Sequence, residues 1–135
     1  SQTQVELCRL GGLPDLNQTQ AGVAAALLSW VHALVSNYSV DGLRVDTVQE
    51  VAADFWAEFQ AAAGVYAVGE VDNGSIELVA PYQRVLDATL HYPLFWVLRQ
   101  AAFAPKPAAA DLRSLRQLEQ VPYMRARRCI GSSYS

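Results

Sequence analysis

Two short strand-like runs, each carrying a carboxylate at its carboxyl end, constrain the fold of this chain most. Residues 40–46, VDGLRVD, end at Asp46, and residues 64–71, GVYAVGEV, carry Glu70. A helix-length segment lies between the runs, and this spacing favours parallel strands joined by a crossover. Because the carboxyl ends of parallel strands meet at one edge of a sheet, we expect the two carboxylates on neighbouring strands there.

Apolar and charged side chains alternate along residues 40–46. Leu43 and Val45 point to one face of the strand, while Gly42, Arg44 and Asp46 point to the other. A charged group that is buried without a partner is costly, so this polar face needs either a pairing partner or a function. From pattern alone, each strand-end carboxylate is equally compatible with a helix N-cap, and the arginine with a plain ion-pair partner.

Helical periodicity flanks the strands. Large apolar residues recur at steps of three and four between residues 22 and 38, and Thr19 or Asn17 is a candidate cap for this helix. A second helical pattern ends at Gly64 and places on one face Val51, Phe55, Phe59 and Ala62.

The rest of the chain follows the same alternation. We expect a third, weaker strand at residues 86–90 after a loop, and a helix over residues 94–103 that Pro93 opens. A further helix is expected near residues 111–120, in a loosely ordered tail. The order of elements predicts an α/β fold with parallel strands.

Length, charge and the length of the apolar runs argue against some classes of protein. The chain has 135 residues, 52% of them hydrophobic, which suits one modest domain with a packed core. Residues 1–104 hold 4 Lys or Arg against 11 Asp or Glu, and residues 105–135 hold 6 against 2. The acidic part argues against nucleic-acid binding. The apolar run 23–35 is shorter than the roughly 20 residues of a membrane span, so we expect no membrane segment.

The two strand-end carboxylates suit one kind of chemistry. Neighbouring strands lie about 4.8 Å apart, and a retaining glycosidase holds its two carboxyl groups roughly 5–5.5 Å apart. One carboxylate would attack the anomeric carbon, and the other would protonate the leaving oxygen and then activate water. Arg44 would favour the ionised form of Asp46.

Several blocks of the sequence resemble the secreted, fungal-type α-amylases, within the α-amylase family of glycoside hydrolases. The blocks occur in the family's order over roughly residues 4–104, and they are LPDLN (13–17), WVHALVSNYSVDGLRVDTV (30–48), DFW (54–56), AAGVYAVGEV (62–71), PYQ (81–83) and YPL (92–94). The resemblance implies a partial (β/α)8 TIM barrel, about strands four to six with their helices. It also implies cleavage of α-1,4-glucosidic bonds in starch-like α-glucans with retention.

The resemblance implies roles for individual residues. Within GLRVDTV, Asp46 matches the family's nucleophile and Arg44 its invariant arginine; within GEV, Glu70 matches the general acid/base. Substrate contacts would fall at Gln49, Asn73 and Gly74. The family commonly has Lys-His where this chain has Gln49 and Glu50.

A structural calcium ion is a further implication. Its ligands here would be the carboxylates of Glu6 and Asp15 and the backbone carbonyl of Glu50, oxygen donors of the kind that calcium requires. The loop between the first two ligands is shorter than in the family. Residues 1–18 would then end a protruding calcium-binding domain, 19–104 would be barrel and 105–135 a divergent tail.

The cysteines fit no dense disulfide framework. Cys8 and Cys129 could bridge each other, or, by the resemblance, Cys8 would pair with a cysteine before residue 1. Ala67 and Ala80 stand where many family members have cysteines.

By the resemblance, the chain is expected to be the central part of a secreted enzyme, although it shows no signal peptide. The family's third catalytic Asp, in an ENHD-type motif, has no counterpart here, and neither do barrel segments before residue 1 or after about residue 105. The chain alone is therefore expected to be inactive. The alternative is a non-catalytic remnant that binds a glucan or a protein.

Overall fold

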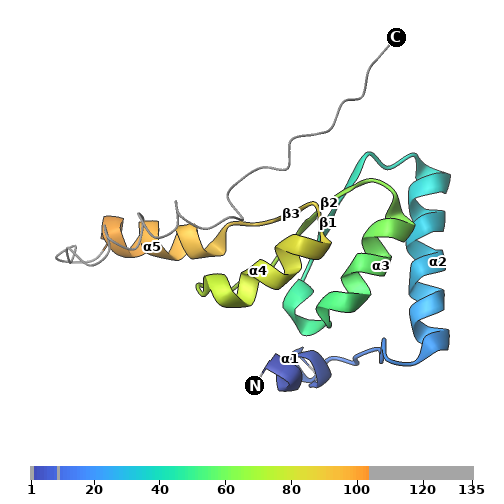
Figure 1. Ribbon diagram of the computed structural model, residues 1–135, viewed down its shortest axis with the longest axis horizontal. Coiled ribbons are helices and arrows are strands. Elements are labelled where there is room, and N and C mark those ends of the chain that lie inside the picture. Colours follow the sequence, from blue (N-terminus) through green and yellow to red (C-terminus); the bar gives the residue numbers. More distant parts are fainter. Residues whose placement is uncertain (1, 9, 104–135) are drawn as a thin grey trace, which may run out of the picture. The chain divides into compact units, whose positions relative to one another are not determined.

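A computed structural model of the chain describes residues 2–8 and 10–103. Figure 1 shows the elements in chain order: α1 (Gln2–Leu7), η1 (Leu10–Gly12), α2 (Ala21–Tyr38), β1 (Gly42–Val45), η2 (Val48–Glu50), α3 (Ala53–Ala63), β2 (Tyr66–Gly69), α4 (Ile76–Val85), β3 (Ala88–Thr89) and α5 (Tyr92–Phe103). A first compact unit ends at Pro93, and a second begins at Leu94, within α5. The predicted helix at 111–120, the tail and Cys129 lie outside the described residues.

The three strands form one parallel sheet in the order β1-β2-β3. Val45 of β1 lies opposite Gly69 of β2, which in turn lies opposite Thr89 of β3. The predicted parallel pairing of the first two strands is confirmed, and all three predicted strands are present in shortened form.

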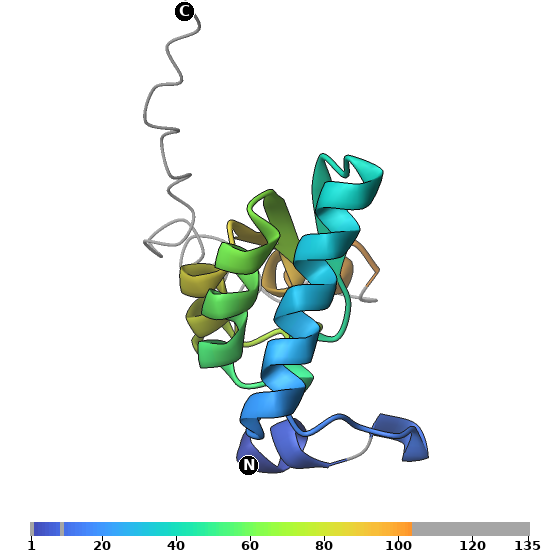
Figure 2. The ribbon, with the colours of Figure 1, turned by 90° about the vertical axis from the view of Figure 1, so that its right-hand side faces the viewer.

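Helices cover one face of the sheet. Ala67 and Gly69 are buried on that face, while Arg44 and Tyr66 point to the other face and are exposed, as the alternation predicts. Figure 2 shows α2 beside α3, and α3 also packs against α4. The core between helices and sheet contains Val31, Val48, Trp56, Phe59, Ala63, Val71, Val79, Tyr82 and Leu86.

The segment between Glu70 and the third strand was expected to be a loop, and this expectation was wrong. It contains α4, with Pro81 inside the helix. Proline lacks the N–H that would continue the helical ladder, so Pro81 locally disfavours a helix. Burial of Val79 and Tyr82 on one side of α4 offsets this loss, since tertiary packing supplies most helical stability.

Helix α2 begins at Ala21, next to the predicted start at residue 22, but the predicted cap was wrong: the cap is Gln20, in extended backbone and without a side-chain cap bond. Asn17 instead holds a local turn: its Oδ1 accepts hydrogen bonds from Thr19 N at 3.0 Å and Thr19 Oγ1 at 2.6 Å. The predicted end of α3 is confirmed, with Gly64 at φ 65° in the left-handed region that glycine favours.

The inward face of α3 differs from the predicted one. Val51 precedes the helix, and the buried residues are Trp56, Phe59 and Ala63. The Trp56 Nε1–H donates to the Val48 carbonyl at 2.9 Å, which gives this large ring a satisfied polar group in the core. The face is thus rotated by about one residue from the prediction.

Helix α2 extends beyond the apolar run 23–35 on both sides, and among the described residues it is the one helix that is long and apolar enough to span a membrane. Its Val31 is fully buried, and its Leu27, Leu34 and Val35 are half-buried. In this fold α2 packs its apolar stripe against α3.

Gly69 is required by close packing. A Cβ placed on it would lie 2.6 Å from Leu86 Cδ1 and 3.0 Å from Val48 Cγ2, closer than ordinary contact distances. Gly69→Ala is therefore expected to lower the free energy of unfolding by about 1–3 kcal/mol, measured by urea denaturation. Gly22→Ala, in α2 with open space around it, is the control and should not destabilise; equal midpoints for the wild type and Gly69→Ala would contradict the packing argument.

Candidate active site

Arg44 joins two carboxylates that lie at the ends of adjacent strands. Its Nη1 lies 2.7 Å from Asp46 Oδ1, and its Nη2 lies 3.0 Å from Glu70 Oε2. The two terminal nitrogens of the Arg44 guanidinium thus pair with carboxylates from two different strand ends. The structure therefore brings together the three residues that the sequence singles out for catalysis.

The backbone beyond the strands fixes this juxtaposition. The Glu70 N–H donates to Val45 O at 2.7 Å, and the Val48 N–H donates to Glu70 O at 2.9 Å. These bonds continue the parallel ladder of β1 and β2 past the last strand residues. Thr47, directly after Asp46, has φ 48°, so the chain turns sharply into η2 at this point.

The two carboxylates occupy different environments. The Asp46 side chain is 66% exposed and that of Glu70 only 17%. The pKa of Asp46 is lowered, first by a hydrogen bond with the Glu70 carboxyl and then by the hydrogen bond from Arg44. A carboxylate that stays ionised beside a second, more enclosed carboxyl is the arrangement that divided nucleophile and acid roles require.

Glu70 is held through both of its oxygens. Oε1 accepts a 2.8 Å hydrogen bond from the Tyr92 hydroxyl, and Oε2 faces Arg44 and the backbone N–H of Thr47, the latter at 3.5 Å. Sequence reasoning missed the contact with Tyr92. The signal was the position of Tyr92, three residues beyond Thr89, which pairs with the residue before Glu70.

The residues predicted to contact substrate lie in the segments that follow β1 and β2. Gln49 is half-buried in η2, and its backbone carbonyl accepts bonds from Gln2 Nε2 at 3.0 Å and the Tyr82 hydroxyl at 3.3 Å. Asn73 Oδ1 accepts the Ser75 N–H at 2.8 Å, which forms the turn that begins α4. Gly74 is exposed within that turn.

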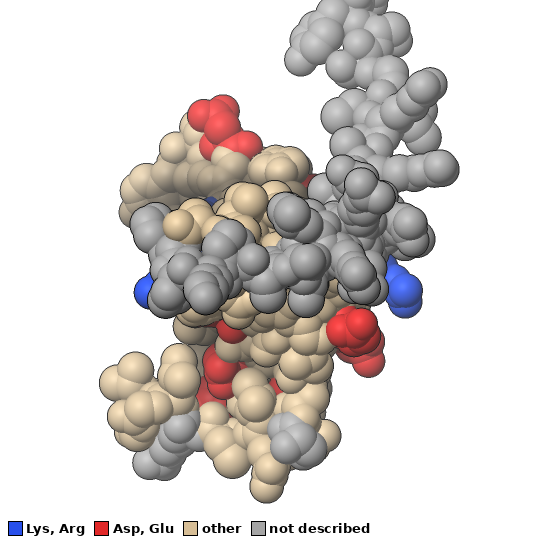
Figure 3. All heavy atoms as spheres, turned by 90° about the vertical axis from the view of Figure 1, so that its left-hand side faces the viewer, with Lys and Arg blue, Asp and Glu red and all other residues tan. Residues whose placement is uncertain are grey.

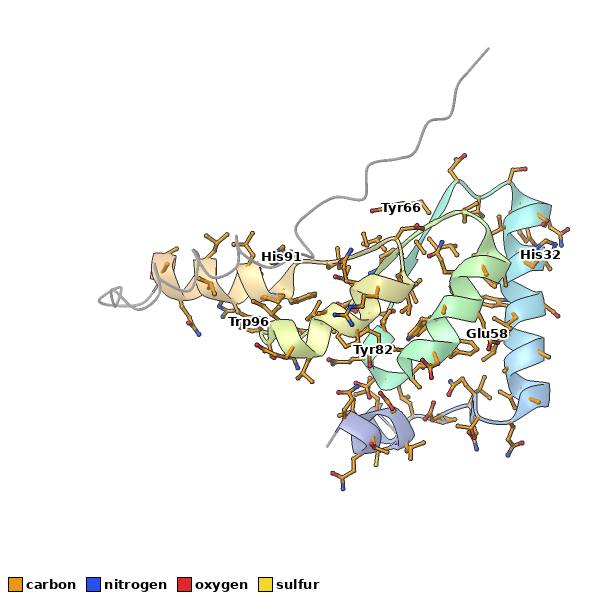
Figure 4. All side chains as sticks on the ribbon, in the orientation of Figure 1. His32, Glu58, Tyr66, Tyr82, His91 and Trp96 are labelled. Carbon is orange, nitrogen blue, oxygen red and sulfur yellow. The ribbon has the colours of Figure 1, made fainter. Side chains whose placement is uncertain are left out.

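Tyr82 links three elements below the sheet (Figure 4). Besides its bond to Gln49, its hydroxyl accepts a 2.8 Å bond from Gln2 Nε2 of α1. Burial first, and the nearby Glu6 carboxylate second, raise the pKa of Tyr82 to about 12. The hydroxyl therefore stays protonated and available as a donor at physiological pH.

The predicted calcium ligands are only partly gathered. Glu6 and Asp15 line one pocket of about 510 Å³, together with Asp54 and Glu58 of α3, whereas Glu50 is not part of its lining. Within the described part of the chain, no group of three or more His, Cys, Asp and Glu side chains could hold a metal ion. Calcium takes six to eight oxygen ligands, so these residues do not form a complete site, and no chemical step here depends on calcium.

The surface charge agrees with the composition. Figure 3 shows one face of the molecule, on which uncharged residues predominate and the basic side chains of the described residues lie apart from one another. A nucleic-acid groove would need clustered Lys and Arg, and this face has no such cluster among the described residues.

Comparison with known proteins assigns the family. Residues 8–126 match the family model of the alpha amylase catalytic domain. The match extends past residue 104, although the resemblance was expected to fade there. Alpha-amylase 1 of Lipomyces kononenkoae is 49% identical over 100 residues, covering 71% of this chain and 16% of that protein. Alpha-amylase 2 of Schwanniomyces occidentalis is 43% identical over 99 residues, covering 70% of this chain and 20% of that protein.

Solved structures give the same result. An alpha-amylase from Malbranchea cinnamomea matches with a TM-score of 0.81 and 37% identity over 89% of this chain and 27% of that one. The acarbose complex of the Geobacillus thermoleovorans alpha-amylase matches with a TM-score of 0.78 and 27% identity over 90% of this chain and 28% of that one. The chain therefore spans under a third of these proteins, and it belongs to the α-amylase family of glycoside hydrolases as part of the (β/α)8-barrel catalytic domain.

Proposed function

We propose that this chain supplies the nucleophile and the general acid/base of a retaining enzyme that hydrolyses α-1,4-glucosidic bonds in starch-like glucans. The observation that carries the proposal is the Arg44 guanidinium, which holds Asp46 and Glu70 at the ends of adjacent parallel strands. Carboxylates from neighbouring strands at this edge are placed to act on opposite sides of one bond.

The reaction would proceed in two displacements. A carboxylate oxygen of Asp46 attacks the anomeric carbon while the glycosidic C–O bond breaks and the leaving oxygen takes a proton from Glu70. Water then gives a proton to the Glu70 carboxylate as its oxygen attacks the anomeric carbon, and the bond to Asp46 breaks. Two inversions give net retention of configuration.

Arg44 supports this division of roles. Its positive charge and hydrogen bond help to keep the pKa of Asp46 low, so the nucleophile is ionised at neutral pH. Glu70 lies at the end of the neighbouring strand, which suits it to the role of proton donor to the leaving oxygen.

We propose that the chain needs other barrel segments for activity, because transition-state stabilisation comes from groups on several strand ends. The proposed divisions remain residues 1–18, 19–104 and 105–135. A polymer such as starch cannot cross a cell membrane, so we also propose an extracellular site of action.

The test is to complete the barrel. In a barrel chimera, residues 2–93 replace the matching part of the Malbranchea cinnamomea alpha-amylase, which aligns with 89% of this chain. We expect the chimera to release reducing sugar from soluble starch and the 135-residue chain to release none. A folded but inactive chimera, together with glucan binding by the chain in affinity electrophoresis, would instead support the non-catalytic binding module; its exposed apolar side chains, such as Leu13, Leu16 and Trp30, favour that second candidate.

Calcium is proposed for the completed barrel only. Glu6 and Asp15 line one pocket and offer carboxylate oxygens, and further ligands would come from outside this chain. Removal of calcium with EDTA is expected to lower the Tm of the chimera, since loss of a ligand at 100 times its Kd costs about 2.7 kcal/mol. The Glu6→Gln chimera should lose most of this difference in calorimetry, and Asp41→Asn, at an exposed position outside this pocket, should keep it. Equal Tm values with and without calcium would refute the proposal.

A further inference from the structure

We propose that Tyr92 is the positioning residue of Glu70, which it holds by its hydroxyl in the orientation needed to protonate the leaving oxygen. This inference rests on the proposed function, because it concerns the acid step of that reaction. Tyr92 does not touch the reacting atoms by this argument, and it acts through Glu70.

The contact is a directed one. The Tyr92 hydroxyl donates to Glu70 Oε1 at 2.8 Å, within the distance range of an O–H···O hydrogen bond. The other oxygen of Glu70 faces Arg44 Nη2 at 3.0 Å. With one donor on each oxygen, rotation of the carboxyl group about its last bond is restricted.

The backbone places Tyr92 for this contact. The Leu90 N–H donates to Gly69 O at 2.9 Å, which extends the pairing of β3 with β2 up to the residue before Glu70. The Tyr92 N–H then bonds to Leu90 O at 2.9 Å, and α5 begins at Tyr92. The following Pro93 is fully buried and fixes the start of the helix. The ring therefore comes from a junction whose backbone is hydrogen-bonded to β2 through Leu90.

Charges around the phenol agree with this contact. The pKa of Tyr92 is raised, first by its hydrogen bond to Glu70 and next by burial, with smaller effects from the charges of Glu70 and Asp72 and an opposing one from Arg44. The phenol thus remains a donor throughout the pH range in which an amylase would work.

If Tyr92 positions the acid Glu70, its loss should affect only substrates whose leaving group needs a proton, whereas the loss of a structural residue should affect all substrates. A sugar leaving group must gain a proton as the glycosidic C–O bond breaks, whereas fluoride leaves a glycosyl fluoride as an anion without protonation. A change that misplaces only the acid therefore slows the first step for glucans and spares it for fluorides. The ratio of kcat/KM for maltopentaose to kcat/KM for α-maltosyl fluoride measures this difference, because kcat/KM reports the glycosylation step.

The first experiment uses the 135-residue chain itself, with ¹³Cζ-labelled tyrosine followed by NMR through a pH titration. The Tyr92 signal, assigned with Tyr92→Phe, is expected to titrate above the ordinary range near 10, and the pKa of Tyr92 is expected to fall in Glu70→Gln, which removes the charge of its hydrogen-bond acceptor. Asp72→Asn is the matched control, and it should produce a smaller shift, since Asp72 acts on Tyr92 through charge alone. An unchanged Tyr92 titration in Glu70→Gln would overturn the proposal.

The second experiment uses the barrel chimera. Tyr92→Phe is expected to lower kcat/KM for maltopentaose about tenfold and that for α-maltosyl fluoride less than about twofold. Tyr38→Phe, at an exposed position in α2, should change neither value. Equal losses on both substrates would refute the role of Tyr92 and leave the proposed function standing. A parent chimera that cleaves neither substrate would overturn the proposed function, and this role with it.

Discussion

Asp46→Asn is expected to reduce kcat/KM of the barrel chimera on soluble starch by about 10⁴-fold or more, as removal of a nucleophile commonly does. The amide cannot form the covalent bond to the anomeric carbon, although it nearly matches the carboxylate in size. The ion pair with Arg44 is lost as well, since the amide carries no charge. Initial rates of reducing-sugar release measure the effect.

The control for this prediction is Asp41→Asn, an exposed aspartate just before β1. It should keep the activity of the parent chimera within about twofold. Thermal melting should show the Asp46→Asn protein folded, because the Asp46 side chain is 66% exposed. An Asp46→Asn chimera that keeps a tenth of the parent rate would show that the nucleophile lies elsewhere.

Trp56→Ala is expected to have the largest effect on folding, a loss of about 3–5 kcal/mol in the free energy of unfolding. The side chain is 6% exposed, and its ring packs edge-on against Phe55 and Phe59 at centroid distances of 5.4 and 5.2 Å. Truncation would also leave the Val48 carbonyl without the indole donor. Such a loss is a large share of the 5–15 kcal/mol that typically stabilises a domain.

Urea denaturation of the 135-residue chain, followed by circular dichroism, measures the loss. Trp30→Ala removes the same side chain from α2 where it is 56% exposed, and it should cost less than about 0.5 kcal/mol. If the two substitutions had equal effects, the core described around α3 would be wrong.

The sequence predicted the parallel strands and the pairing of the two carboxylates because each rests on a local pattern. Alternation in residues 40–46 separates Arg44 from Leu43 by face, and the crossover length then determines which strand ends meet. The Arg44 bridge to Glu70 follows from that register.

What the sequence did not predict depends on tertiary packing. Pro81 argues locally against a helix, and only the burial of Tyr82 and Val79 in the core makes α4 stable. The inward face of α3 is rotated by about one residue, from Phe55 to Trp56, and the Trp56 indole N–H bonds to the Val48 carbonyl. Tyr92 and Glu70 are 22 residues apart in the sequence, and periodicity predicts only contacts within one helix or strand.

The Tyr82 hydroxyl also determines the order in which this chain can assemble. Its partner Gln2 lies 80 residues earlier, in the first helix. During synthesis α1 is made before the other elements that the structure describes, yet its bond to Tyr82 cannot form until α4 has been synthesised. Closing a loop of this length costs more conformational entropy than forming the shorter-range contacts among β1, α3 and β2. Helix α1 is therefore expected to dock late among the elements that the structure describes.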